Sequence, residues 1–145
     1  MGRALGVDLG ERRVGLALSD AGRVLASPFA VLERSPDREA LHRAIVRIAR
    51  DEECTVVVVG LPLSLDGSLG RAAEGVLEEV AVLRGAAGAD LAVEVHDERL
   101  TTVTAQHALI EARMRRDARR RVVDKVAAAV MLQSWLDSRQ RPASE

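Results

Sequence analysis

The sequence predicts an α/β protein in which helices flank a mixed five-stranded sheet. Three strand-like segments open the chain, and the short turns between them are of the kind that join antiparallel strands into a meander. The hydrophobic period then changes, and helical patterns alternate with strand patterns. A meander followed by alternating helices and strands is typical of a mixed sheet that is covered by helices.

The meander comes first in the chain. Turn-forming residues at 10–13 and at 20–22 separate runs of apolar and β-branched residues. Pro28 lies inside the third run and indicates an edge strand or a bulge, because proline cannot donate a ladder hydrogen bond. The strands of the meander are expected at 4–9, 14–19 and 24–32.

Helices and strands alternate in the rest of the chain. Pro36 suits an early helical position, and apolar residues recur at helical spacing as far as Arg50. The arginine-rich stretch 113–121 is expected to be a loop or a frayed helix. Further strands are expected at 55–59 and 91–96, and further helices at 72–83, 101–112 and 122–136.

Length and composition fit one globular domain. The chain has 145 residues, of which 48% are hydrophobic and 30% charged. We expect a single domain over residues 1–138 and a polar tail over 139–145. Cys54 is the only cysteine and is expected to be a buried small hydrophobe. No secretory signal or membrane-spanning run is visible, so a cytoplasmic location without membrane contact is expected.

Charge and aromatic content limit the ways in which the protein can bind nucleic acid. The formal net charge of −1 does not indicate a nucleic-acid-binding protein, but arginines crowd the stretch 113–121. That stretch, which includes Arg119 and Arg120, is interpreted as a clamp on a phosphate backbone or as a solvated segment. With one Phe, one Trp and no Tyr, stacking on single-stranded bases is not expected.

Asp8 is the first candidate functional residue. Strand alternation places Ala4, Gly6 and Asp8 on one face of an apolar segment, where a carboxylate is costly unless an ion or a partner compensates it. The small neighbours are expected to leave room for an ion and a phosphate. A hydrogen-bonded aspartate near a turn is the alternative interpretation.

Two further acidic positions complete the candidate set. Asp97 and Glu98 end the strand expected at 91–96, and alternation predicts that only one of them serves the site. Solvated charges that start the next helix are the alternative. Asp124 leads an apolar stripe on the last helix and is expected to point inward, although an acid near a helix N-terminus is favourable in any case.

The three carboxylates suggest a divalent-cation site. Mg²⁺ and Mn²⁺ prefer oxygen ligands, and two such ions can activate a water and stabilise a leaving oxygen at a phosphodiester. The histidines are scattered and are expected to be core or surface residues. The glycines between Gly6 and Gly15 are similar to the phosphate loop of actin-like ATPases, which favours a nucleotide-binding regulator as a weaker alternative.

Four segments, in order along nearly the whole chain, resemble the YqgF/RuvX family. They are Gly6-Val7-Asp8-Leu9-Gly10 with Arg12-Arg13-Val14-Gly15 and Ser19-Asp20; Val59-Gly60-Leu61-Pro62-Leu63 with Asp66-Gly67; Asp97-Glu98-Arg99-Leu100-Thr101-Thr102 with Ala105; and Val123-Asp124-Lys125-Val126-Ala127-Ala128 with Leu132-Gln133. The resemblance implies an RNase H-like fold related to Holliday-junction resolvases of the RuvC type.

The resemblance also implies residue roles. It makes Asp8, Glu98 and Asp124 the ligands of the catalytic metals, Mg²⁺ or Mn²⁺, and leaves open whether Asp97 assists Glu98. Six more residues fall within the motifs and are expected to position phosphates or orient the carboxylates, with salt bridges to neighbouring acids as the alternative for Arg99 and Lys125. These six are Arg12, Arg13, Arg99, Thr101, Thr102 and Lys125.

Two activities are associated with the family. One is maturation of the 5′ end of pre-16S ribosomal RNA, and the other is resolution of Holliday junctions in branched DNA. We favour RNA processing, because a resolvase needs two active sites, normally from a symmetric dimer, and no dimerisation seam is evident. The expected protein is a monomer or a homodimer. A non-catalytic RNA-binding factor is the remaining alternative.

Overall fold

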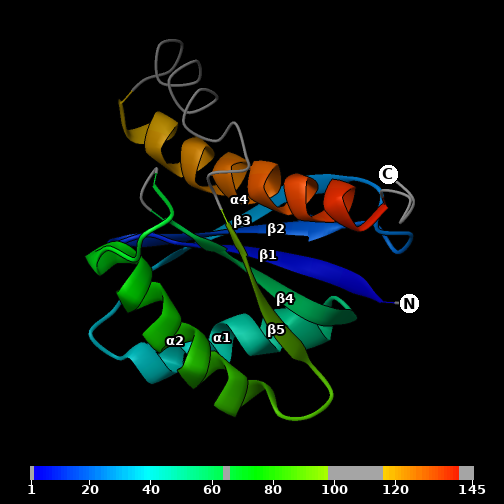
Figure 1. Ribbon diagram of the computed structural model, residues 1–145, viewed down its shortest axis with the longest axis horizontal. Coiled ribbons are helices and arrows are strands. Elements are labelled where there is room, and N and C mark those ends of the chain that lie inside the picture. The colour runs from blue at the N-terminus through cyan, green and yellow to red at the C-terminus, as the bar shows by residue number, and fades with distance from the viewer. Residues whose placement is uncertain (1, 64–65, 98–115, 141–145) are drawn as a thin grey trace.

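The computed structural model describes residues 2–63, 66–97 and 116–140. Five strands form one sheet in the order β3-β2-β1-β4-β5 (Figure 1). The described elements are β1 (Arg3–Leu9), β2 (Arg13–Ser19), β3 (Ala26–Glu33), α1 (Arg38–Asp51), β4 (Cys54–Leu61), α2 (Arg71–Ala87), β5 (Ala92–Asp97) and α4 (Arg116–Gln140).

The pairing of the strands confirms the predicted mixed sheet. β1, β2 and β3 form an antiparallel meander, whereas β1 pairs with β4, and β4 with β5, in parallel. The carboxyl ends of the three parallel strands, at Leu9, Leu61 and Asp97, therefore lie along one edge of the sheet. We call this the carboxyl edge. Strand β2 begins there, at Arg13, because it runs in the opposite direction.

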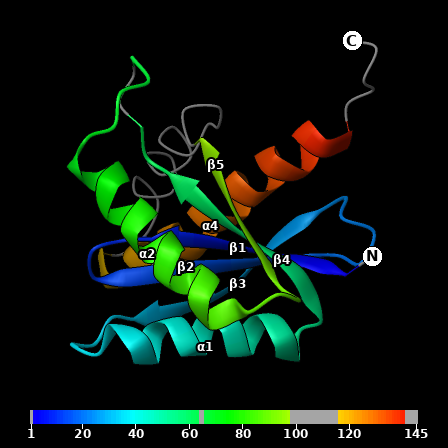
Figure 2. The same ribbon diagram turned by 60° about the horizontal axis from the view of Figure 1, so that its bottom comes forward.

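Helices cover both faces of the sheet. Figure 2 shows α1 and α2 in front of the sheet and α4 behind it. Val57 and Val59 of β4 belong to the core under α1 and α2, whereas Val56 and Val58 belong to the core under α4. All four valines are almost completely buried, as expected of a parallel strand between two helical layers.

The third strand is both an edge strand and a bulged one, as Pro28 indicated. β3 pairs only with β2, and the register changes so that Leu16 faces Ala30 while Ala17 faces Pro28. One residue of β3 is therefore extra at this point, which is the definition of a bulge. The side chain of Gln133 in α4 accepts a hydrogen bond from the backbone N–H of Ala26, which attaches this strand to the helix.

The bounds of two helices differ from those predicted. Helix α2 continues to Ala87 rather than 83, and it ends only at Gly88, whose φ of 78° is a left-handed conformation that favours glycine. Helix α4 begins at Arg116 rather than at 122, so residues 116–121 of the stretch that was predicted to be a loop or a frayed helix have helical backbone. The helix predicted over 101–112 lies outside the described residues. Among the described helices, none has the length and apolar character needed to cross a membrane.

Candidate active site

Asp8 lies next to the end of β1, at the carboxyl edge. It shares the α4 face of the sheet with Ala4 and Gly6, while Leu5 and Val7 enter the core under α1 and α2. The faces assigned by strand alternation are therefore confirmed. The side chain is neither fully buried nor fully exposed, so its carboxylate is held at the rim of the core, in reach of solvent.

Gly15 brings Asp124 close to Asp8. Gly15 is the direct cross-strand partner of Asp8 in the β1–β2 ladder. A Cβ atom on Gly15 would lie only 2.0 Å from the backbone oxygen of Asp124. Only glycine allows this approach of helix to sheet. Two aspartates far apart in the sequence thus flank one position of the sheet.

The small size of Gly6 makes room for helix α4 and not for an ion. A Cβ atom there would lie 2.8 Å from Cβ of Leu132 in α4, so the space beside Gly6 is filled by helix packing. The prediction that small neighbours of Asp8 leave room for a metal and a phosphate is wrong at this position. Any ligand of Asp8 must bind beyond Gly6, toward the carboxyl edge.

Arg13 holds the second aspartate. Its Nε donates a hydrogen bond of 2.7 Å to Oδ2 of Asp124, and the two side chains are 21% and 28% exposed. Because Arg13 begins β2 at the carboxyl edge, this ion pair turns the carboxylate of Asp124 toward that edge. Of the two roles expected for the motif residues, orientation of a carboxylate is the one that this contact provides.

The other predicted site residues divide into two groups. Arg12 is exposed in the turn between β1 and β2, and Lys125 is half-buried beside Asp124 without an ion pair among the described residues. Asp97 ends β5 and is paired in register with Leu61. The remaining predicted positions lie outside the described residues, or have side chains that do; they are Glu98, Arg99, Thr101, Thr102, Arg119 and Arg120.

The donor set of the site suits a hard cation. Asp8 and Asp124 offer carboxylate oxygens, which Mg²⁺ and Mn²⁺ prefer. Among the described residues, no group of three histidine, cysteine or acidic residues could hold a metal. Glu98 lies outside the described residues. The two aspartates therefore fit as part of a metal site and do not constitute a full ligand set by themselves.

The described histidines and the cysteine are structural, as predicted. His42 and His96 are buried, and their Nε2 atoms lie 2.9 Å from Oε1 of Glu79 and 3.0 Å from Oγ of Ser134, respectively. Burial lowers the pKa of His96 below its ordinary value. Cys54 is also buried, and burial raises the pKa of its thiol to about 11, which disfavours the reactive thiolate.

A buried ion-pair network supports the loop that follows Asp8. Arg34 makes two hydrogen bonds to the Glu79 carboxylate, of 3.1 and 2.8 Å, and a third of 2.6 Å to the backbone oxygen of Gly10. Burial raises the pKa of Glu79, but the hydrogen bonds from Arg34 and His42 outweigh it and leave the pKa below its ordinary value.

Sequence reasoning did not find this network. A signal was present, because Glu79 lies between Val76 and Val80 on the apolar stripe of α2, where an acid needs a partner. The identity of that partner was not readable, because Arg34 precedes α1 and is far from Glu79 in the sequence.

The fold matches that of solved RuvC structures. RuvC of Thermus thermophilus in complex with a Holliday junction substrate superposes with a TM-score of 0.57 at 15% identity, covering 96% of each chain. A second Thermus thermophilus RuvC structure gives a TM-score of 0.56 at 17% identity, covering 94% of this chain and 95% of the other. The protein thus has the RNase H-like fold of the RuvC type.

Comparison of the sequence identifies the family, whereas comparison of the structure identifies only the fold. The family model described as "RuvX: Holliday junction resolvase" matches residues 2–138. A Roseiflexus protein named "Putative pre-16S rRNA nuclease" is 42% identical over 139 residues, covering 96% of both chains. A Mycobacterium tuberculosis protein of the same name is 41% identical over 139 residues, covering 95% of this chain and 80% of the relative. The chain belongs to the RuvX family.

Proposed function

We propose that the protein is a divalent-metal-dependent endonuclease that processes the 5′ end of pre-16S ribosomal RNA. The observation that carries the proposal is that Asp8 pairs with Gly15 and Asp124 packs against Gly15, at the carboxyl edge of the sheet. A pair of carboxylates in that place suits the binding of hard cations at a phosphodiester. The names of the RuvX relatives favour ribosomal RNA as the substrate.

In this proposal Asp8, Glu98 and Asp124 hold Mg²⁺ or Mn²⁺. When bound, such ions activate a water molecule and neutralise the leaving oxygen. Glu98 is included because it directly follows Asp97, the last residue of β5. Arg13 fixes the orientation of Asp124 through the hydrogen bond from its Nε.

Substrate contacts are proposed for the cations and hydroxyls around these acids. Arg12 is exposed at the carboxyl edge, where its guanidinium is free to contact a phosphate on the strand that enters the site. Lys125 adds a positive charge directly after Asp124 in the chain. The proposed set is completed by Arg99, Thr101, Thr102, Arg119 and Arg120.

Resolution of Holliday junctions is the second candidate. It is favoured by the description of the matching family model. Because a junction must be cut at two symmetric positions, this activity requires a dimer that presents two sites. The oligomeric state therefore separates the two candidates and is measured by light scattering on the purified protein, with and without a junction.

The deciding experiment is a cleavage assay in Mg²⁺ or Mn²⁺. A labelled precursor leader of 16S ribosomal RNA and a four-way DNA junction are incubated separately with the protein. Cutting of the RNA alone is expected. The control is Asp8→Asn, which keeps the size of the side chain but replaces one carboxylate oxygen with an amide nitrogen and removes the charge.

Each other result changes the conclusion. Paired nicks in the junction alone would assign the resolvase activity. Binding of RNA without a metal-dependent product would indicate a non-catalytic factor. Full cleavage by Asp8→Asn would remove Asp8 from the site and with it the basis of the proposal.

A further inference from the structure

Strand β5 is attached to helix α4 by polar side chains that alternate along the strand. Glu94 forms an ion pair with Arg139, and both of these side chains are exposed. His96 is only 8% exposed, and its Nε2 atom lies 3.0 Å from Oγ of Ser134. In Figures 1 and 2 the carboxyl end of β5 lies beside α4. The two elements are therefore joined directly, through side chains of each.

The order of these contacts shows how the strand and the helix run. The step from Glu94 to His96 along β5 is about 6.6 Å, at about 3.3 Å per residue. The contacts on α4 step back from Arg139 to Ser134, which is about 7.5 Å at about 1.5 Å per residue. The two lengths are nearly equal, so β5 and α4 run side by side in opposite directions. The carboxyl end of β5 therefore points along α4 toward Asp124.

His96 also lies in the same row of the sheet as Asp8. Val7 is paired with Val59, so Asp8 and Gly60 come next in these parallel strands, and Gly60 is paired with His96. Asp8 and His96 both lie on the α4 face. Between them β4 contributes only Gly60, which has no side chain. At about 4.8 Å per strand, their Cα atoms are about 10 Å apart. The hydrogen bond of His96 with α4 is therefore made at the level of the candidate site.

A hydrogen bond fixes the spacing of strand and helix more sharply than apolar packing does. The neighbours of Ser134 along α4 include Met131, Leu132 and Trp135, which are apolar and buried. A hydroxyl among them has a desolvation cost that its hydrogen bond offsets. This bond requires a narrow range of distance and angle, whereas the hydrophobic effect has no direction. The pair of His96 and Ser134 is therefore suited to setting the position of β5 against α4.

We propose that the hydrogen bond between His96 and Ser134 positions the metal-binding carboxylates, by holding the carboxyl end of β5 at a fixed distance from the helix that carries Asp124. This inference rests on the proposed nuclease function, in which Asp124 and Glu98, directly after β5, hold the same ions. His96 and Ser134 do not contact the ions in this role, and they set the spacing of the residues that do. Loss of the hydrogen bond weakens metal binding and leaves the protein folded.

Ser134→Ala tests the contact with a small change of shape. Isothermal titration with Mn²⁺ measures the affinity, and thermal unfolding without metal gives the Tm. The variant is expected to bind Mn²⁺ about tenfold more weakly, at the lower end of the roughly 10–100-fold loss that follows removal of groups that support metal ligands. Its Tm is expected to fall by only a few degrees, because one hydrogen bond is lost. Unchanged affinity for Mn²⁺ would overturn the proposal.

Ser138→Ala is the matched control. Ser138 lies on the same helix, and its hydroxyl donates a hydrogen bond of 2.7 Å to the backbone oxygen of Trp135, so this bond stays within α4. Its loss is expected to leave the Mn²⁺ affinity within about twofold of the wild type. An equal loss of affinity in S134A and S138A would overturn the proposal, because any hydroxyl of α4 would then have the same effect.

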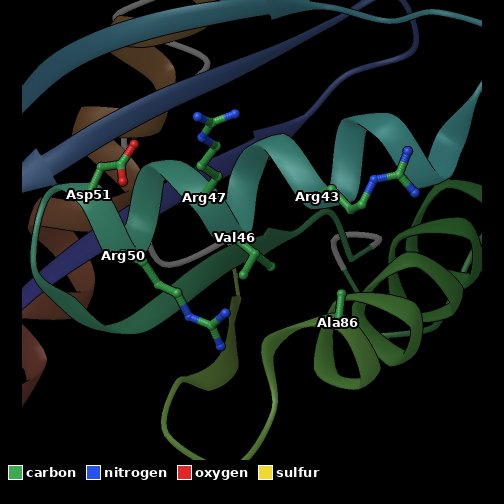
Figure 3. A pocket seen from close by; sticks show the side chains of 6 residues that line it. All are labelled: Arg43, Val46, Arg47, Arg50, Asp51 and Ala86. Carbon is green, nitrogen blue, oxygen red and sulfur yellow. The ribbon is translucent and has the colours of Figure 1, made fainter.

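A second control separates positioning from a general loss of stability. In the hollow of about 330 Å³ that Figure 3 shows, Arg50 of α1 donates a hydrogen bond to the backbone oxygen of Ala87 in α2 and pairs with Asp90 at 3.2 Å. Arg50→Ala also removes contacts between elements, but on the face of the sheet opposite to α4. Its Tm is expected to fall while its Mn²⁺ affinity stays within about twofold of the wild type. A loss of affinity as large as that of S134A would overturn the proposal.

Conservative substitutions test whether the hydrogen bond itself is responsible. Ser134→Thr keeps the hydroxyl, and His96→Gln places an amide group close to the position of Nε2. Both are expected to bind Mn²⁺ within about twofold of the wild type. His96→Asn, with a shorter side chain, is expected to lose as much affinity as S134A, and H96N/S134A no more than either single variant. Additive losses, or failure of both conservative variants, would overturn the proposal.

The outcome is separable from that of the proposed function. If the wild type cleaves neither substrate but S134A binds Mn²⁺ more weakly, the nuclease proposal fails and the positioning contact remains. If cleavage depends on Asp8 while S134A binds Mn²⁺ normally, the positioning proposal fails alone. Absence of Mn²⁺ binding by the wild type would overturn both.

Discussion

Arg13 is the residue that fixes the side chain of Asp124, through a hydrogen bond of 2.7 Å. Arg13→Ala is expected to weaken Mn²⁺ binding by about 10–100-fold, the usual cost of removing a partner of a metal ligand. Isothermal titration with Mn²⁺ measures this directly. Arg12→Ala, at the exposed neighbouring position, is the control and should bind the ion normally. Tighter Mn²⁺ binding in Arg13→Ala would contradict the positioning role, because it would show that the guanidinium mainly repels the ion.

Gly15 is the residue whose lack of a side chain allows helix α4 to lie close to the sheet at the site. Gly15→Ala is expected to lower the free energy of unfolding by about 1–3 kcal/mol or more, because the added Cβ would overlap the backbone oxygen of Asp124. Denaturant titration measures the change. Gly85→Ala is the matched control, since a Cβ there meets nothing within 4 Å, and it should stabilise α2 by about 1 kcal/mol. Equal effects of the two substitutions would show that α4 does not depend on Gly15.

At the scale of elements, the network of Arg34, Glu79 and His42 joins α1, α2 and the loop after Asp8. The folded pKa of Glu79 is below its ordinary value of 4.5, so its stabilisation is complete above that pH. It is lost as the pH falls through the folded pKa. Glu79→Gln is expected to lower the free energy of unfolding by roughly 3 kcal/mol at neutral pH, because Arg34 loses its buried, charged partner.

The pH dependence of unfolding tests whether the contribution of Glu79 to stability is lost in acid. Between neutral pH and pH values below 4.5, the wild type should lose more stability than Glu79→Gln, so that the two unfolding curves converge in acid. Denaturant titrations at several pH values give both curves. A difference between the two proteins that stays constant over this range would show that the Glu79 carboxylate does not contribute through its charge.

Most elements were predictable from the sequence because their hydrophobic periods are strong. The two faces of β1 followed from alternation, and Pro28 indicated both the edge position and the bulge of β3. The start of α4 was predicted too late, at 122, and the preceding stretch was left open between a loop and a frayed helix, because these first turns are rich in arginine and carry no apolar stripe. The approach of Asp124 to Asp8 was not predictable from spacing, since it depends on how closely a helix can lie on Gly15.

At the scale of the molecule, one sheet separates two hydrophobic cores. Leu132 fills the core under α4 and also occupies the space beside Gly6. Leu132→Ala is expected to cost about 2–5 kcal/mol, as for other buried leucines. Thermal and denaturant unfolding measure this loss of stability. The control is Val82→Ala, at a half-exposed position, which is expected to lower the free energy of unfolding by less than about 1 kcal/mol. A separate early transition in Leu132→Ala would show that α4 can leave the sheet without unfolding the rest.

The contact between Gly15 and Asp124 has a consequence for the timing of biosynthesis. Asp8 is in the first strand and Asp124 in the last described helix, so a nascent chain carries only one of the two aspartates for most of its synthesis. At about 5–20 residues per second, the interval is on the order of ten seconds. A half-made chain on the ribosome therefore has no complete pair of carboxylates. If the site cuts ribosomal RNA, it cannot do so before most of the chain has been translated.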